Sequence, residues 1–194
     1  QDSEESSVTV RGELRLGQAD SGSAVDDFYN LRNGTLYVNT LKLGYVSPAR
    51  MDVCGGALTV NNVAYLKQGE FVQSAGTSTL AAGISVGDAG LIPSVTLGGG
   101  TMVLDGNITT PWIPERQTFD FAGGTLRTTN TLSSTIPFRV SNTVTFDTPA
   151  AGKTFTLNAG LSGSGTLVKT GAGTLLLGNA TTNFVSGGLV ISNG

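Results

Sequence analysis

Several residue types are scarce or missing in this 194-residue chain, and each shortage excludes a class of chemistry. There is no histidine, so neither a Ser-His-Asp triad nor a Cys-His pair can form, and the commonest zinc ligand is missing. The single cysteine, Cys54, excludes an internal disulfide. With no histidine to activate it, we expect Cys54 to be a small apolar packing residue rather than a reactive thiol.

Charged residues are also scarce, at 13% of the chain, and the net charge is −3. The basic residues are scattered and form no cluster typical of a nucleic-acid-binding or polybasic membrane-binding surface. No run of about 18 apolar residues is present that would cross a bilayer. We therefore expect no nucleic-acid partner and no membrane insertion.

Glycine, in contrast, is abundant, with 28 residues, about twice the usual share. Thr, Ser, Asn and Val make up much of the remainder. β-Branched residues suit pleated strands, and glycine supplies the positive φ angles of tight turns. Long windows of helical periodicity are missing, so the sequence predicts an all-β protein.

Short glycine-containing phrases recur along the chain. The segments NGTLYV, GGALTV, AGTSTL, GGGTMVL and AGGTLRT carry a glycine at positions 34, 56, 76, 99 and 124, which by subtraction gives spacings of 22, 20, 23 and 25 residues. A second phrase (LRLG, LKLG or ISVG) ends in glycine and lies between copies of the first. Each unit therefore contains about three short strands and three turns in roughly 20–25 residues.

A unit this small cannot bury its own apolar face, but stacked copies can if each strand pairs in parallel with its equivalent one coil away. The repeats therefore predict a parallel β-helix (β-solenoid) of roughly eight or nine coils. Alternation along the strands predicts two sets of side chains. The inward set is Leu36, Val38, Leu58 and Val60, and the outward set is Thr35, Tyr37 and Thr59.

Residues 119–194 resemble the passenger-associated repeat of bacterial autotransporters, and weaker repeats of this type cover residues 12–118. The matching segment includes GLSGSGTLVKTGAGTLLLGN, and the matching positions are Gly163, Gly165, Lys169, Thr170, Gly171, Gly173, Thr174, Leu175, Gly187 and Gly188. The resemblance implies a right-handed parallel β-helix displayed outside the cell. The chain is also similar to β-helical carbohydrate-binding modules of secreted bacterial polysaccharide-degrading proteins.

We expect a single domain over residues 1–194, with an N-terminal cap at 1–11, irregular coils at 12–118 and passenger-repeat-like coils at 119–194. The open end of a β-helix carries unpaired backbone groups. The charged segment from Asp2 to Glu5 is expected to shield the first coil. The end near Gly194 has no such device, so we expect other domains or an oligomer contact to cover it.

The glycines around Lys169 also invite comparison with a phosphate-binding loop. A P-loop requires glycine immediately before its Lys-Thr pair, and this chain has Val168 there. The G-x-G-x-x-G fingerprint requires a third glycine, and Val168 and Leu176 occupy those places. The segment is therefore predicted to be scaffold, with Lys169 at a solvent-facing strand position.

Candidate catalytic residues are few. Asp26 and Asp27 are adjacent, but consecutive strand residues face opposite sides, and the Gly-His motif that accompanies such a pair in polygalacturonases is missing. We expect solvated loop carboxylates or, with Asn30, a weak Ca²⁺ site. Arg50 and Asp52 are the nearest candidates for lyase chemistry, but this is a common surface combination. The sequence predicts a protein that is not an enzyme and needs no cofactor, with a β-helical polysaccharide lyase or hydrolase as the alternative.

The only tryptophan, Trp112, lies in the loop NITTPWIPERQTFD between two predicted strands. Pro111 and Pro114 prevent ladder pairing there and stiffen the loop. Sugars bind to flat aromatic faces flanked by polar side chains. The Trp112 ring either forms such a platform or folds back over the solenoid as a hydrophobic lid, and the sequence leaves both open.

Further polar and aromatic residues complete the candidate sugar-binding set. Glu115, Arg116 and Gln117 follow the tryptophan and can bond sugar hydroxyls. Tyr37, at an outward strand position, and Tyr45, just after LKLG, can extend the platform. A packing role suits each tyrosine equally well.

Two functions from different classes remain. The first is a non-catalytic extracellular carbohydrate-binding module, tethered within a larger secreted bacterial protein and binding a polysaccharide such as a plant cell-wall glycan. The second is a structural stalk or adhesin segment of an autotransporter-like surface protein. They differ in whether Trp112 and the tyrosines converge on one exposed face.

Overall fold

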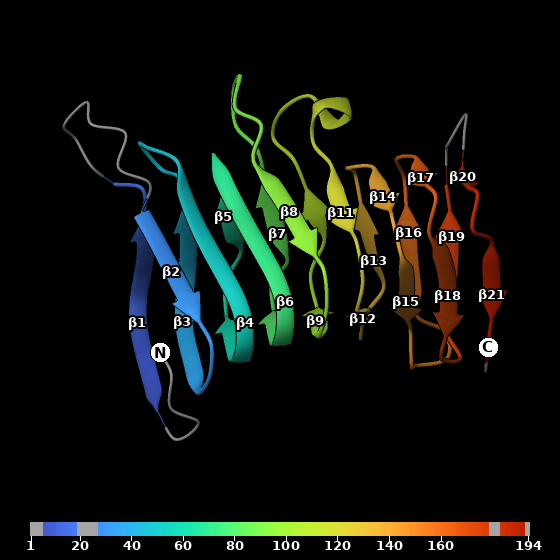
Figure 1. Cartoon of the computed structure of the whole chain (residues 1–194), viewed down its shortest axis with the longest axis horizontal. Helices are drawn as coiled ribbons and strands as arrows, with labels where there is room; N and C mark the ends of the chain where they lie inside the picture. Colours follow the sequence, from blue (N-terminus) through green and yellow to red (C-terminus); the bar gives the residue numbers. More distant parts are fainter. Residues whose placement is uncertain (1–5, 19–26, 179–182, 193–194) are drawn as a thin grey trace.

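The computed structural model of the chain describes residues 6–18, 27–178 and 183–192. It is an all-β solenoid of about seven turns, in which parallel strands stack coil upon coil (Figure 1). The predicted parallel β-helix is confirmed, although there are about seven turns rather than eight or nine. The described residues contain one 3₁₀ turn, η1 (Pro114–Arg116), and no helix that could cross a membrane.

The strands form three parallel ladders, which we call A, B and C in chain order. Ladder A contains the first part of β1 (Ser7–Leu16) and of β3 (Thr35–Leu43), the second part of β4 (Ala49–Val60) and of β6 (Gly69–Leu80), then β9 (Thr101–Leu104), β12 (Thr125–Thr128), β15 (Thr143–Asp147), β18 (Thr166–Thr170) and β21 (Leu189–Ile191).

Ladder B contains the second part of β1 and β3, then β5 (Ala64–Leu66), β7 (Ile84–Val86), β10 (Ile108–Thr109), β13 (Leu132–Ser134), β16 (Thr154–Leu157) and β19 (Thr174–Leu177). Ladder C contains β2 (Asp27–Leu31), the first part of β4 and β6, then β8 (Ser94–Leu97), β11 (Phe119–Phe121), β14 (Phe138–Val140), β17 (Leu161–Gly163) and β20 (Phe184–Val185). Three short strands per coil is the unit that the repeats predict.

A column of glycines explains why the segment NGTLYV and its equivalents recur along the sequence. Five glycines that precede ladder A strands have φ between 62° and 75°, namely Gly34, Gly56, Gly76, Gly100 and Gly124. A Cβ on Gly76 would lie 2.4 Å from the Gly56 carbonyl oxygen of the preceding coil, and the other contacts along the column are similar. Left-handed backbone and close coil stacking both require glycine here. In the fourth copy the left-handed residue is Gly100, one position later than the sequence comparison assigned.

The core runs along the inside of the three ladders. Leu36, Val38, Leu58 and Val60 are buried, as predicted, and so are six phenylalanines in the central and later coils. Phe119 and Phe138 are register partners in ladder C, with ring centroids 4.5 Å apart and an interplanar angle of 9°. Aromatic residues on successive coils therefore stack into a continuous core.

The structure corrects two expectations about single residues. Lys169 is not solvent-facing: it is 6% exposed and occupies an inward ladder A position, beside Phe146 in the neighbouring coil. Its ammonium donates to the carbonyl oxygens of Thr170, at 2.5 Å, and Gly171, at 2.8 Å, so the corner of the coil supplies the acceptors that a buried lysine needs. Cys54 is exposed rather than packed in the core.

Side chains at inward positions are exposed at both ends of the described solenoid, among them Val8, the register partner of Leu36, at 43%. Ser7–Val10 already pair with Thr35–Val38, so the first rung begins inside the segment expected to be a cap. The predicted shield from Asp2 to Glu5 lies outside the described residues. At the other end, Leu189 and Ile191 occupy inward positions but are 54% and 71% exposed, because no described coil stacks on them.

Candidate functional site

A row of loops follows the ladder B strands and projects from one edge of the solenoid (Figure 1). In the first two coils the strand ends in a left-handed glycine, Gly17 and Gly44, with φ of 80° and 68°. A Cβ on Gly44 would lie 1.7 Å from the Gln68 carbonyl oxygen, so the chain can turn there only as glycine. The residue after this turn is Tyr45, which is thereby held at the corner between ladders B and C.

Tyr45 and Tyr65 line one shallow groove of about 510 Å³ on the ladder B side. Tyr45 is 41% and Tyr65 is 39% exposed. The remaining lining residues are Glu13, Thr40, Lys42, Asn62, Val63, Lys67 and Ala82. Lys42 and Tyr65 are register partners on β3 and β5, so residues 23 positions apart in sequence lie side by side. The groove is therefore built from four successive coils, to which β1, β3, β5 and β7 belong.

Three cations surround the Tyr45 ring. The Lys67 ammonium lies 4.6 Å, the Arg15 guanidinium carbon 5.4 Å and the Lys42 ammonium 5.6 Å from its centroid. Lys42 is also 5.9 Å from the centroid of Tyr65. Cation–π attraction at these distances favours this arrangement of cations and rings.

Two carboxylates complete the electrostatics of the groove. Glu13 pairs with the Lys42 ammonium at 2.7 Å and with Arg15, and Asp88 pairs with the Lys67 ammonium at 2.8 Å. Hydrogen bonds from Lys42 and Arg15 hold the pKa of Glu13 below its ordinary value. The Lys67 ammonium does the same to the pKa of Asp88, and the carboxylate in turn raises the pKa of Lys67. Both carboxyl groups are therefore ionised at neutral pH.

An amide and a hydroxyl, those of Asn62 and Thr40, also line the groove. The Asn62 side-chain amide donates to the Thr40 hydroxyl at 3.2 Å, and next to them in sequence the Asn61 amide donates to the Asn39 oxygen at 3.2 Å. These pairs join equivalent corners of neighbouring coils. Each keeps further donor or acceptor capacity facing outward, because an amide has two donors and a two-lone-pair acceptor.

Trp112 lies on the same edge of the solenoid as Tyr45, but three coils farther along. At one strand spacing per coil, this separation is roughly 14 Å along the solenoid axis. Trp112 is 40% exposed, and its backbone N–H donates to the Thr110 hydroxyl at 3.1 Å. It follows β10 as Tyr45 follows β3, yet it does not line the groove. The tryptophan is thus partly open to solvent, apart from both tyrosines of the groove.

The other predicted sugar-binding residues are dispersed. Gln117 is fully buried and donates to the Leu91 carbonyl at 3.1 Å, so it holds the loop in place and cannot bond a sugar hydroxyl as expected. Arg116 is exposed in η1, and the side chain of Glu115 lies outside the described residues. Tyr37 is outward, as predicted, but on ladder A, between Thr9 and Thr59. Among the members of the predicted set whose side chains are described, Tyr45 alone lines the groove.

The candidates for a weak calcium site, Asp26, Asp27 and Asn30, are only partly within the described residues, so this site stays a prediction. Asp27 accepts a hydrogen bond from the Gly17 backbone N–H at 2.7 Å, which fixes the first ladder B turn. Asn30 lies on the outward side of β2, next to Asp52 in register, and Asp26 lies outside the described residues. No group of three or more His, Cys, Asp or Glu side chains gathers within residues 6–18, 27–178 and 183–192.

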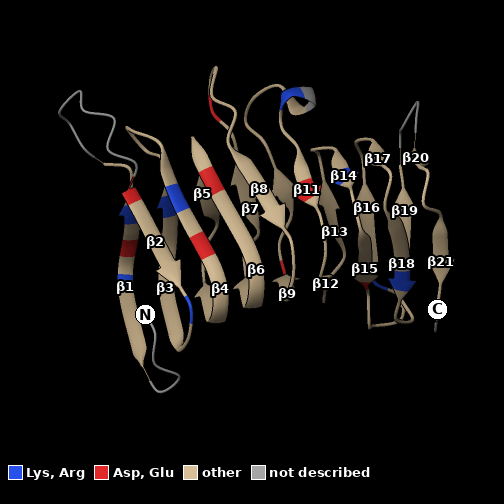
Figure 2. Ribbon diagram, viewed as in Figure 1, with Lys and Arg blue, Asp and Glu red and all other residues tan. Residues whose placement is uncertain are grey.

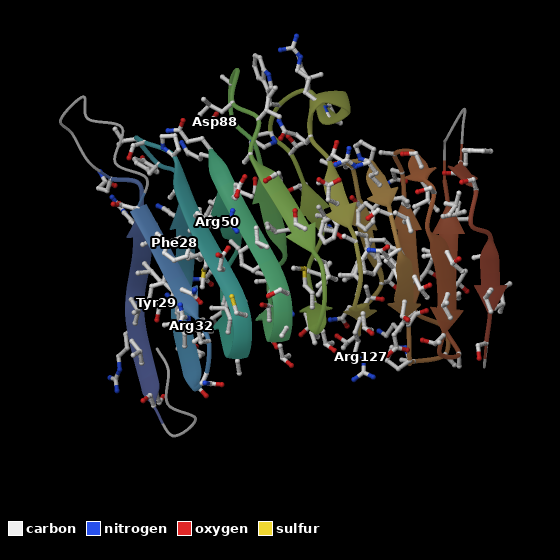
Figure 3. All side chains as sticks on the ribbon, in the orientation of Figure 1. Phe28, Tyr29, Arg32, Arg50, Asp88 and Arg127 are labelled. Atoms are coloured by element: carbon white, nitrogen blue, oxygen red, sulfur yellow. The ribbon has the colours of Figure 1, made fainter. Side chains whose placement is uncertain are left out.

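A second hollow, of about 470 Å³, lies on ladder C beside Phe28, which is 55% exposed. Phe28 and Arg50 are register partners on β2 and β4 (Figure 3). Arg50 is engaged by Asp52 at 2.8 Å and also by Glu70. The hydrogen bond to Asp52 raises the pKa of Arg50 further, which favours the protonated guanidinium.

Figure 2 colours positions of both charge signs on the ribbon of β1–β4 and β6, in the part of the solenoid that carries both hollows. Sequence reasoning missed Tyr65, Lys42 and Lys67 as groove residues. The signal was present, because AYLKQG occupies the same place in its coil as LKLG, but its glycine is displaced by two residues.

No family model, curated protein or solved structure matches this chain.

Proposed function

We propose that this domain binds polysaccharide without cleaving it, and that the groove between Tyr45 and Tyr65 is the binding surface. The observation that carries the proposal is the placement of two half-exposed tyrosines in one groove with amide and hydroxyl groups beside them. Aromatic faces pack against sugar rings, and flanking polar groups bond the hydroxyls. An open groove along stacked coils suits a polymer, since its ends need not fit inside a closed cavity.

The charges of the groove support binding rather than hydrolysis. Glycoside hydrolysis requires a general acid, a carboxyl group whose pKa is raised so that it holds its proton near neutral pH. Glu13 and Asp88, the carboxylates paired with the lysines of the groove, both have their pKa lowered by those cations. A module that binds without catalysis, cofactor or metal is consistent with this arrangement.

An extracellular location is part of the proposal and follows from the resemblance of the repeats to those of secreted and surface-displayed bacterial proteins. The domain would then hold its parent protein on a cell-wall or extracellular glycan. A shallow groove buries little ligand area, so affinity is expected to be modest, roughly micromolar to millimolar.

Affinity electrophoresis against xylan, glucan, galactan and pectin tests the proposal. We expect the wild-type domain to be retarded by at least one polysaccharide. Tyr65→Ala should lose most of that retardation while keeping its circular dichroism spectrum, because the ring is exposed. Tyr37→Ala, an outward tyrosine on ladder A, is the matched control and should be retarded like the wild type.

Two outcomes would redirect the assignment. Retardation that survives Tyr45→Ala and Tyr65→Ala but is lost in Trp112→Ala would move the site to the loop before η1. A wild-type domain that no polysaccharide retards would exclude binding and leave the stalk or adhesin function.

A further inference from the structure

The Tyr45–Tyr65 groove concentrates positive charge in an acidic protein. Three of the chain's 11 basic residues, Arg15, Lys42 and Lys67, lie within 4.6–5.6 Å of the Tyr45 centroid. Two carboxylates, Glu13 and Asp88, pair with them, which leaves one positive charge more than negative in the cluster. The whole chain carries a charge of −3, so this local balance is opposite in sign to that of the molecule.

Two of these cations are direct neighbours across the ladder. Arg15 and Lys42 are direct register partners on β1 and β3, and like charges in adjacent strand positions repel each other. Glu13 alone bridges the two among the described residues. Folding by itself does not call for adjacent cations on an outward surface, whereas an anionic ligand does.

The lysines retain capacity for such a ligand. Each ammonium has three donors, and within the described residues Lys42 and Lys67 each engage one carboxylate. The two ammonium groups stand over the same tyrosine ring, with the Tyr65 ring on the side of Lys42. A negatively charged substituent of a sugar in the groove would find ammonium donors on both lysines, which line the groove together with the two tyrosines.

The ladder C hollow provides a comparison, because its cation, Arg50, is fully neutralised by carboxylates. Arg50 is held by two carboxylates, Asp52 and Glu70, so the charge balance there is negative. The two hollows are similar in size, yet only the Tyr45–Tyr65 groove has an excess of cations.

We propose, building on the polysaccharide-binding function, that the groove selects anionic polysaccharides, with a carboxylate or sulfate group seated between Lys42 and Lys67. Glu13 is the internal counter-ion with which the ligand anion competes for Lys42 and Arg15. Removing the Glu13 charge therefore strengthens binding of anionic polymers and leaves binding of neutral polymers unchanged. A purely structural role of Glu13 would not produce that gain.

The test compares three galactose-based probes that differ in charge: polygalacturonate, a sulfated galactan and a neutral galactan. Binding is measured by affinity electrophoresis at low and high salt. We expect the anionic probes to be retained more strongly than the neutral one, and raising the salt from about 0.01 M to about 1 M to remove the difference, since the Debye length falls from about 30 Å to about 3 Å. Preference for polygalacturonate or for the sulfated galactan identifies the anion as carboxylate or sulfate.

Three variants locate the effect. Lys42→Gln should weaken binding of the anionic probes about two- to fivefold, the range expected for one exposed ion pair. Glu13→Gln should strengthen it by a similar factor. Lys153→Gln removes a positive charge remote from the groove and should behave like the wild type.

The outcomes separate the two proposals. If the neutral galactan is retained as strongly as the anionic probes, and Lys42→Gln and Glu13→Gln change nothing, the anion selectivity is wrong while polysaccharide binding stands. If none of the probes nor the wider polysaccharide panel is retained, both fail. If Lys153→Gln weakens binding as much as Lys42→Gln, the attraction is a general effect of net charge, and the seat between the lysines is refuted.

Discussion

Replacing Lys169 with methionine separates the two contributions of this side chain, its buried stem and its ammonium group. The stem lies at an inward ladder A position between Phe146 and Ile191 of the neighbouring coils. The ammonium donates to the carbonyl oxygens of Thr170 and Gly171, where the chain leaves β18. Methionine keeps an unbranched stem of similar reach and removes both hydrogen bonds.

The expected loss is the difference between two opposing terms. Hydrogen bonds from a charged donor contribute about 1.5–3 kcal/mol each, so two contribute about 3–6 kcal/mol. Burying an ammonium costs several kcal/mol, which offsets most of that gain. We expect Lys169→Met to lower the free energy of unfolding by about 1–2 kcal/mol. Lys169→Ala also removes the buried stem and should cost about 2–5 kcal/mol more.

The stability of the wild type should also depend on alkaline pH. Burial lowers the pKa of Lys169 below the ordinary value of 10.5, and Asp147 opposes this only in part. Between the folded pKa and 10.5 the unfolded chain binds more protons than the folded chain, so stability rises with pH in that window. Lys169→Met has no such group and should lack this rise.

Urea unfolding followed by far-UV circular dichroism, at neutral pH and near pH 10, measures both effects. Hydrogen exchange of the β18 amides shows whether the change is local to the late coils, as expected for a solenoid in which each coil contacts its neighbours. If Lys169→Met and Lys169→Ala are both as stable as the wild type, the inward position is wrong, and Lys169 faces solvent.

Four further outcomes follow from the structure. Phe138→Ala should lower the free energy of unfolding by about 3–5 kcal/mol in urea titration, and a loss below about 1 kcal/mol would contradict the stacked phenylalanine core. Gly87→Ala places a Cβ 2.7 Å from the Gln117 side chain at a φ of 93°, so it should loosen the tryptophan loop; an unchanged Trp112 emission spectrum would argue against this. The exposed apolar end around Ile191 should cause concentration-dependent association in sedimentation velocity that Ile191→Asp weakens, and a wild type that stays monomeric at all concentrations would refute it. The lowered pKa values of Glu13 and Asp88 mean that their ion pairs stabilise the fold above their ordinary pKa values and are lost as pH falls through the folded ones; acid titration should show a smaller loss for Glu13→Gln than for the wild type.

The solenoid could be predicted because its determinants are local and periodic. The glycines at 34, 56, 76, 100 and 124 recur once per coil, and each has a φ that other residues rarely adopt. Alternation then places Leu36 inside and Thr35 outside without knowledge of any distant contact. The sequence of each repeat determines where its chain turns and which side chains face inward. Successive repeats with the same pattern can therefore stack on one another.

Lys169 shows where local reasoning stops. Alternation with Leu167 predicts an inward position for Lys169, whereas its charge favours an outward one. Nothing in the local sequence shows which of these two preferences is stronger. The deciding groups are the carbonyl oxygens of Thr170 and Gly171, which the coil corner turns toward the ammonium. A buried charge is tolerated only where such acceptors exist, and their direction is a property of the folded corner.

The sequence by itself determined the all-β class, the coil length and the residues that line the core, because these depend on spacing and on glycine. Which residues come together in the Tyr45–Tyr65 groove was decided only by the tertiary structure. Lys42 meets Tyr65, and Tyr45 meets Lys67, because one coil separates them and the corner after ladder B points both pairs to the same side. Coil lengths vary by several residues, and a slip of one residue turns an outward side chain inward, so which distant residues become neighbours is fixed by the register of the stacked strands.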